Sequence, residues 1–211
     1  MKNEKVIEVK PIVINTVTIT IAGDSDLILN KIDAWTERLL KDKQTGKPKT
    51  TETPNEWLIK ATKIHWIRPF EGEYNEANFY ENLKKNAACI SAFGLKKSFG
   101  ETVVRTGLDK YKTSFDASVN VLGENNLVPI KFAEHHIDEK LISPGRGKPP
   151  VLSTQNRFTG WSADITIQYL DNGKFSLEQI IQIVGLAGFS MGIGSGRSSG
   201  YGRYHVQGVT K

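Results

Sequence analysis

The fold of this chain is best predicted from its tail, which reads Gly188-Phe-Ser-Met-Gly-Ile-Gly-Ser-Gly-Arg-Ser-Ser-Gly-Tyr-Gly-Arg-Tyr-His-Val206. Two arginines, Arg197 and Arg203, lie among six glycines, which are Gly188, Gly192, Gly194, Gly196, Gly200 and Gly202. Because glycine has no Cβ, such a run can adopt left-handed backbone angles and lie close against a ligand. Backbone N–H groups beside arginines are suited to phosphate. The tail therefore predicts an anion-binding loop.

The segments that flank this loop show regular periodicity. Residues 161–169 alternate between apolar and polar side chains, which indicates a half-buried strand. Ser176 and Gln179 form a capping box, and an apolar stripe from Leu177 to Ala187 follows, so a helix precedes the loop. Residues 201–209 predict a final strand. The last part of the chain thus reads strand, helix, loop, strand.

The beginning of the chain shows a similar pattern. Residues 12–21 are β-branched and alternating, which predicts a strand, with Asp24 or Ser25 as the cap of the helix that follows. Apolar residues from Ile28 to Leu39 have helical spacing, and residues 57–69 predict a second strand. Two βαβ units in one antiparallel sheet give an α+β, ferredoxin-like (RRM-like) βαββαβ fold.

We expect three parts in this fold. Residues 1–70 form the first βαβ half, in which the basic stretch 41–56 has almost no apolar residue and is expected to be a mobile loop. Residues 71–160 form a large insertion with a helix at 75–90, a hairpin of strands 116–122 and 127–132, and basic loops. Residues 161–211 form the second half, with the glycine-rich loop at 188–203.

A helix followed by this Gly/Arg run and a last strand resembles the glycine-rich loop of the repeat-associated mysterious proteins (RAMPs), the ferredoxin-like subunits and processing enzymes of CRISPR systems. The resemblance is carried by residues 188–206, where Gly192, Gly194, Gly196, Arg197, Gly200, Gly202 and Arg203 occupy the family pattern. The tail is also similar to that of phage proteins, so a phage-encoded relative fits.

The resemblance implies binding of single-stranded nucleic acid, RNA above all, across the sheet and the loop, with assembly of subunits along the strand. It does not imply catalysis. Processing members of the family use a histidine or tyrosine near the first helix, where this chain has no histidine, and nothing marks Asp109 or Asp116 as the aspartate of effector subunits.

Composition limits the classes of protein that fit. The 211 residues carry a net charge of +5, with 38% hydrophobic residues and one cysteine, Cys89. This excludes an intrachain disulfide framework and fits a reducing compartment. The charged start and the lack of a long apolar run predict a cytoplasmic protein without a membrane partner.

Clusters of basic residues favour a polyanionic partner, although lysine runs are also ordinary solvated surface. From these clusters and the loop we predict a nucleic-acid site made of Gly192, Gly194, Gly196, Arg197, Gly200, Arg203, Lys96, Lys97, Arg105, Arg146, Lys148 and Arg157. Phe158, Trp161 and Tyr201 could stack on bases or belong to the core. No cofactor is predicted, and four histidines with one cysteine make a metal site a poor hypothesis.

Three functions are compatible with these residues. The first, which we favour, is a non-catalytic binder of single-stranded RNA or DNA. The second is a metal-independent endoribonuclease with His65 or His205 as general acid or base. The adjacent His135 and His136 would point to opposite faces of a strand and are interpreted as surface or edge residues. The third is a sponge for small signalling nucleotides in phage–host conflict.

Overall fold

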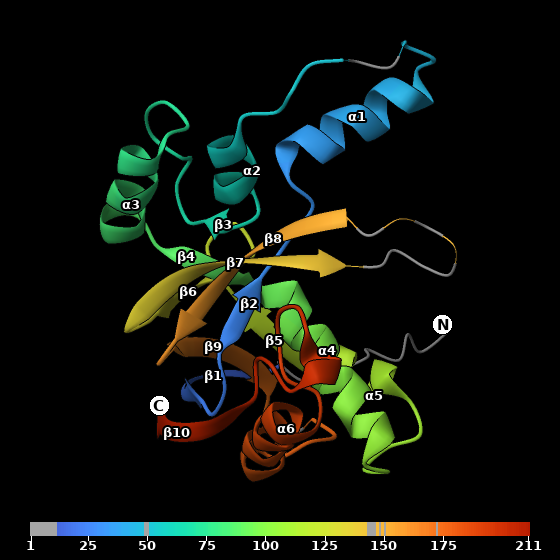
Figure 1. The fold of residues 1–211 in the computed structure, drawn as a ribbon. Coiled ribbons are helices and arrows are strands. Elements are labelled where there is room, and N and C mark those ends of the chain that lie inside the picture. Colours follow the sequence, from blue (N-terminus) through green and yellow to red (C-terminus); the bar gives the residue numbers. More distant parts are fainter. Residues whose placement is uncertain (1–11, 49–50, 143–146, 148, 150, 172) are drawn as a thin grey trace, which may run out of the picture.

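The protein is described by a computed structural model that covers residues 12–48, 51–142, 147, 149, 151–171 and 173–211 (Figure 1). Its elements are β1 (Ile14–Gly23), β2 (Leu27–Leu29), α1 (Ala34–Gln44), α2 (Glu56–Thr62), β3 (His65–Trp66), α3 (Glu76–Lys85), β4 (Ala88–Ser91), α4 (Ala92–Arg105), α5 (Lys112–Ser118), β5 (Val119–Leu122), β6 (Leu127–Lys131), β7 (Glu134–Ile142), β8 (Val151–Thr159), β9 (Ser162–Leu170), α6 (Leu177–Ser190), the short 3₁₀ helix η1 (Arg197–Ser199) and β10 (Tyr204–Thr210).

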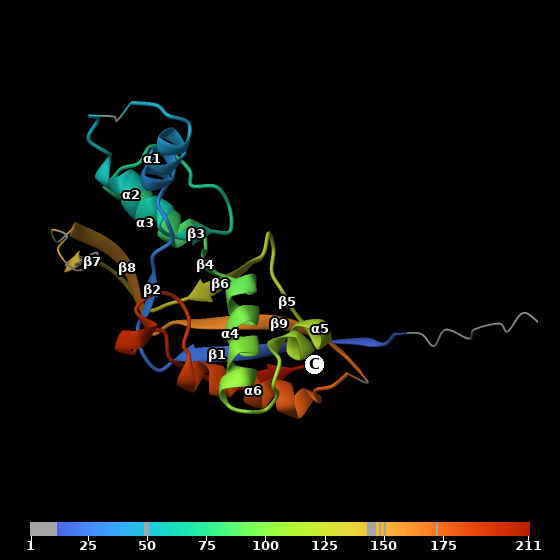
Figure 2. The ribbon, with the colours of Figure 1, turned by 90° about the vertical axis from the view of Figure 1, so that its right-hand side faces the viewer.

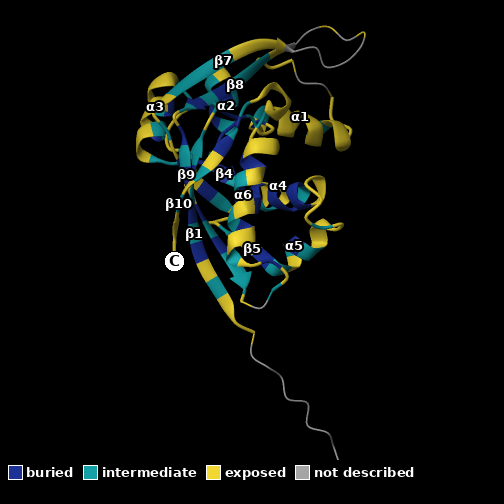
Figure 3. Ribbon diagram, turned by 90° about the horizontal axis from the view of Figure 1, so that it is seen from below, coloured by how far each residue is buried: buried dark blue, intermediate teal, exposed yellow. Residues whose placement is uncertain are grey.

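Seven strands form the main sheet, and all of its pairings are antiparallel. The order is β10–β1–β9–β6–β4–β3, and β5 also pairs with β9. Figure 3 shows α4, α5 and α6 together on one side of β1, β9 and β10. The order β10–β1–β9–β5 with α4 and α6 is that of a ferredoxin-like unit. The predicted α+β class with an antiparallel sheet is confirmed.

A second, three-stranded sheet has the order β2–β8–β7. Strands β7 and β8 form a hairpin that is paired from Glu134 and Thr159 at its base to Ile142 and Val151 toward its tip. Figures 1 and 2 show α1, α2 and α3 gathered with this hairpin on the side of the molecule away from α6. The smaller sheet and these three helices therefore form one wall beside the main sheet.

The first half of the chain differs from the prediction. The helix expected from Ile28 to Leu39 begins only at Ala34, because residues 27–29 are buried as β2 and Asp33 caps the helix by accepting a hydrogen bond from the Thr36 amide at 2.8 Å. Residues expected to form a strand from Trp57 onward are helical through Thr62, since the Asn55 side chain caps α2. The last turn of α1 also extends into the stretch 41–56.

The first helix of the core is α4, in a region that we had placed in the insertion without predicting a helix there. Helix α4 buries Leu95, Phe99 and Val103 against the sheet, in the same core cluster as Ile180 and Val184 of α6. The first βαβ unit is therefore β1–α4–β5. The inserted residues lie partly between β1 and α4, within the first unit, and partly between β5 and β9, which is between the two units.

The second half agrees with the prediction at the level of its elements. Ser176 and Gln179 form the predicted capping box, with the Gln179 amide 3.3 Å from the Ser176 hydroxyl and the Ser176 amide 2.9 Å from the Gln179 side chain. Within the predicted insertion, Asn75 caps α3 as expected. The predicted turn at 123–126 joins β5 to β6, and Asn125 and Asn126 adopt the left-handed backbone angles that Asn tolerates.

Two aromatic residues that we considered for base stacking belong to the core. Trp161 is 1% exposed and Phe158 is fully buried. The Trp161 indole donates a hydrogen bond to the Ser25 carbonyl at 2.7 Å and packs edge-on against Tyr204. Neither side chain can reach a nucleic acid from these positions.

His135 lies at the junction of the hairpin and α3 and is more buried than expected for a surface histidine. Its ring packs against Phe79 and Phe158, and its Nε2 lies 3.0 Å from the Asn156 side-chain oxygen. Burial lowers the pKa of His135 below its ordinary value of 6.5, and the hydrogen bond with Asn156 only partly opposes this. Burial and the charge of Lys31 lower the pKa of His65 in the same direction.

These two histidines predict a loss of stability on mild acidification. Because their pKa values are lower in the folded than in the unfolded chain, the unfolded chain binds more protons below about pH 6.5. The free energy of unfolding should therefore fall as the pH drops from 7 toward 5, before the carboxylates titrate. Urea unfolding across this range measures it. The double variant His65→Asn, His135→Gln should show a flatter profile, and a profile as steep as that of the wild type would contradict the prediction.

Candidate nucleic-acid interface

The glycine-rich loop leaves α6 and runs to β10 through a series of left-handed backbone angles. Gly192, Gly194, Gly196, Gly200 and Gly202 all have φ between 65° and 87°. Gly188, which we had included in the loop, lies in the last turn of α6, and a Cβ there would lie 2.0 Å from the Tyr204 carbonyl oxygen. A Cβ at Gly202 would lie 1.9 Å from the Ile193 carbonyl oxygen. The glycines therefore satisfy both backbone angle and close packing.

Residues Ser25 and Asp26, between β1 and β2, hold this loop in place. The Asp26 carbonyl accepts the Gly202 amide at 2.8 Å. The Ser25 hydroxyl donates to the Gly200 carbonyl at 2.8 Å and accepts the Arg203 amide at 2.9 Å. Further along, the Ser195 amide donates to the Ile28 carbonyl at 2.8 Å. Both ends of the loop are thus fixed to the segment that follows β1.

These bonds change the expected role of the loop amides. Several amides that we expected to face phosphate donate within the protein instead, including those of Ser195, Gly200 and Gly202. Within the described part of the chain, the amides of Gly194, Gly196, Arg197 and Ser198 have no hydrogen-bond acceptor. Only this shorter part of the loop can offer backbone donors to a ligand.

The two loop arginines keep their charges. Arg203 donates to two carbonyl oxygens, that of Phe189 at 2.8 Å and that of Arg197 at 3.4 Å. Arg197 has no side-chain partner among the described residues. Since neither guanidinium is paired with a carboxylate in the described ranges, both remain sources of positive charge at the surface.

A cleft of about 320 Å³ lies beside the loop. Its walls are the loop, the start of α4, the residues that follow β2, and the ends of β3 and β4. The cations that line it are Lys31, Lys63, Lys97 and Arg197, and the acid that lines it is Glu101. The Lys63 ammonium already donates a hydrogen bond to the Thr154 carbonyl. Lys31 and Lys97, in contrast, form no ion pair with any described residue. The cleft is therefore basic.

A second hollow, of about 490 Å³, continues from this cleft along the outer side of the loop. It is lined by Arg105, Arg197 and Arg203 together with loop residues 194–198. Arg197 lines both hollows. Residues Lys97, Glu101 and Arg105 are four apart on α4, so they lie on one face of that helix, which the loop faces. Seven of the predicted site residues, from α4 and the loop, thus line one basic surface: Gly192, Gly194, Gly196, Arg197, Arg203, Lys97 and Arg105.

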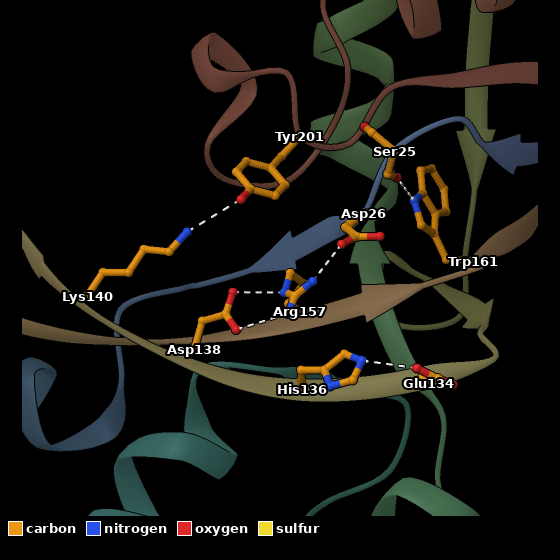
Figure 4. Close-up of polar contacts among 9 residues, drawn as sticks. All are labelled: Ser25, Asp26, Glu134, His136, Asp138, Lys140, Arg157, Trp161 and Tyr201. Atoms are coloured by element: carbon orange, nitrogen blue, oxygen red, sulfur yellow. Dashed lines mark hydrogen bonds and ion pairs between the residues drawn. The ribbon is translucent and has the colours of Figure 1, made fainter.

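Other predicted site residues are placed differently. Arg157 forms ion pairs with Asp26 and Asp138, each with an N–O distance of 2.8 Å, so its charge is neutralised and it joins the hairpin to the segment after β1 (Figure 4). We therefore correct its assignment to the nucleic-acid site. Arg146 and Lys148 lie outside the described residues. Lys96 does not line the cleft or the second hollow; it lines two other hollows, one of which shares Lys97 with the cleft.

Tyr201, the third stacking candidate, is half-buried in the loop. The Lys140 ammonium of β7 lies 3.4 Å from its hydroxyl and 5.2 Å from its ring centroid (Figure 4). His136, on the same strand, contacts Glu134 at 3.2 Å. Tyr201 thus links the loop to the hairpin, and one face of its ring is already used by a cation.

The open face of the main sheet is an unsuitable surface for nucleic acid. Its outward residues on β1 and β9 pair with one another: Thr18 with Thr166, and Thr20 with Asp164 at 2.7 Å. Lys131 donates to Asp164 at 3.0 Å. Alternation places no aromatic side chain on this face of β1, β9 or β5. On these three strands bases would find no aromatic stacking partner, so they add no support to the prediction that binding extends across the sheet.

Sequence reasoning missed Lys31 and Lys63 as lining residues. Neither belongs to a cluster in the sequence, and each reaches the cleft only because β2 and α2 lie beside the loop. His65, which we named only as a candidate acid or base, lines the same cleft. His205 contacts Asp24 at 2.6 Å on the exposed side of β10 and is not among the residues that line the cleft.

The chain is similar in fold to a chain of one solved complex. A chain of the cryo-EM structure of the type III-B Cmr-beta bound to cognate target RNA matches with a TM-score of 0.52 at 10% sequence identity. The match covers 93% of this chain and 60% of that chain, so this chain spans about 60% of its length. The likeness supports the RAMP-like fold that the glycine-rich loop predicted, and at this identity it concerns the fold alone.

The crystal structure of Cmr6 from Pyrococcus furiosus matches with a TM-score of 0.36 at 14% identity, over 92% of this chain and 99% of that chain, which is too weak to support an argument. No family model matches the sequence, and no curated protein matches it. In the part of the chain that the structure describes, no helix has the length and apolar character needed to span a membrane.

Two glycine substitutions test how the loop is held. Gly202→Ala should destabilise the protein by about 3 kcal/mol or more, because strain at positive φ adds to a backbone clash. Gly200→Ala is the matched control: its φ of 87° is similarly left-handed, but nothing lies within 4 Å of the added Cβ, so the cost should be about 1 kcal/mol. Chemical denaturation measures both. Equal effects would show that packing against Ile193 does not restrain the loop.

Proposed function

We propose that this protein binds a single strand of nucleic acid, RNA in particular, in the basic cleft between α4 and the glycine-rich loop. The observation that carries the proposal is the row of cations along two joined hollows. Lys31, Lys97, Arg197 and Arg105 line them without an ion pair to any residue that the structure describes. Unpaired cations in a groove attract phosphates, and phosphate contacts dominate the affinity for nucleic acid.

The shape of the site favours a single strand over a duplex. The cleft is small, at about 320 Å³, and it is lined by apolar residues such as Ile28 and Leu95 as well as by cations. An unpaired base can enter such a space while its phosphates stay with the lysines and arginines at the rim. The free amides of Gly196, Arg197 and Ser198 add donors for one phosphate.

The similarity in fold to a chain from a complex that is bound to target RNA supports this proposal. Assembly of several copies, or of this chain with other subunits, along one strand belongs to the same proposal. Arg157 has no part in it, since its charge is neutralised by Asp26 and Asp138.

Salt titration of binding to a labelled single-stranded RNA tests the proposal. We expect the affinity to fall steeply as the salt concentration rises. Each phosphate contact that a variant loses should make the slope of log K against log salt shallower by about 0.7. Arg197→Gln and Lys97→Gln should each show this loss, which corresponds to roughly a four-fold weaker complex at physiological salt.

Lys131→Gln is the matched control. It removes the same charge from the open face of the sheet, where Lys131 is paired with Asp164. Its affinity should equal that of the wild type. If Lys131→Gln weakens binding more than Arg197→Gln, the strand lies on the sheet and not in the cleft. The same titration with DNA of equal sequence decides between the two polymers, and competition by a small nucleotide reveals a sponge.

A second candidate function, metal-independent cleavage of the bound RNA, is favoured by the position of His65. This histidine lines the cleft, and burial together with Lys31 lowers its pKa, so it is neutral at pH 7 and able to accept a proton from a ribose hydroxyl. Structured and unstructured RNA should then be cut in the presence of a chelator by the wild type, but not by His65→Asn, which should still bind. Intact RNA after incubation with the wild type would exclude cleavage.

A further inference from the structure

A third hollow adjoins the cleft at the first turn of α4. It has a volume of about 490 Å³ and is lined by residues of α4, α5 and β5 and by the turn before β6. Lys97 lines both this hollow and the cleft, so the two are neighbours with a shared cation. A strand that lies in the cleft can therefore continue past Lys97 into the third hollow.

The hollow presents one aromatic ring to solvent. Phe93 lines it and is 66% exposed, although phenylalanine is usually buried. Its position is fixed by the backbone: the Ala92 amide donates to the Asn126 carbonyl at 2.9 Å, and the Phe93 amide donates to the Asn126 side chain at 3.0 Å. Ser91 caps the same turn by accepting the Gly94 amide. The ring is thus carried by a rigid helix start.

Cations surround this ring. Lys96, Lys97 and Lys112 line the hollow, together with a single acid, Asp116. None of the three ammonium groups is paired with a carboxylate within the described ranges. An apolar segment of a protein would leave these charges without a partner, whereas a polyanion with flat bases would satisfy both the charges and the ring. Charge complementarity therefore favours nucleic acid over protein as the occupant.

We propose that Phe93 is a stacking platform for one unpaired base of the strand held in the cleft, with Lys96, Lys97 and Lys112 binding the phosphates on either side of that base. The inference rests on the proposed function and adds a base-binding subsite to it. Aromatic side chains stack on unpaired bases with little dependence on sequence, because every base has a π-face. Phe93 should therefore contribute affinity without strong base preference.

Substitution of the ring tests the subsite in the full-length protein. Phe93→Ala should weaken binding of single-stranded RNA by about ten-fold, because the stacking of one base is lost. The slope of log K against log salt should not change, because every phosphate contact is kept. Phe93→Trp should restore the affinity, and its added indole emission should be quenched by RNA but not by inorganic polyphosphate, which has charges and no bases. Polyphosphate should bind the wild type and Phe93→Ala equally.

Phe189→Ala is the matched control, because Phe189 is an exposed phenylalanine of α6 that does not line this hollow. Its affinity for RNA should not change. If the wild type binds RNA with a steep salt slope while Phe93→Ala binds equally well, the stacking subsite is wrong and the proposed function stands. If the wild type does not bind RNA at all, both the stacking subsite and the proposed function are wrong. If Phe93→Ala instead abolishes self-association in sedimentation, the ring belongs to a protein interface.

Discussion

The site depends on two consecutive residues, Ser25 and Asp26, which connect β1 to β2. Their hydroxyl and carbonyl groups hold Gly200, Gly202 and Arg203, so the loop has a defined shape although it contains five left-handed glycines. Glycine-rich segments lose much conformational entropy on ordering, and these hydrogen bonds offset that loss. Without them the loop would not form a wall of the cleft.

In the proposed interface, side chains rather than main-chain amides are the main donors available to a phosphate. Many loop amides are already bonded within the protein, but Arg197 and Arg203 are not neutralised. On the other wall, Lys97 and Arg105 occupy the face of α4 that the loop meets. The cleft is basic because the fold brings two unrelated runs of sequence together, each only moderately charged by itself.

The sequence predicted the second half of the fold better than the first, for physical reasons. The capping box at Ser176 and the alternation of β9 are local signals that tertiary packing left unchanged. Helix α4 was obscured because small or polar residues, including Ser98, Gly100 and Thr102, are also buried in it. The apparent helix from Ile28 was wrong because Ile28 is buried in a strand of another sheet. Within the site, clustered residues such as Lys97 and Arg197 were identifiable, whereas Lys31 reaches the cleft only through long-range contacts.

The Arg157 bridge has a mechanical consequence. From the β7–β8 hairpin, Arg157 forms an ion pair with the Asp26 carboxylate (Figure 4). The carbonyl of the same aspartate accepts the Gly202 amide. Asp26 is thus held from two sides, by the hairpin at its carboxylate and by the loop at its carbonyl, and the Lys140–Tyr201 contact joins the same two segments. The hairpin and the loop are therefore coupled, because both are attached to the same aspartate.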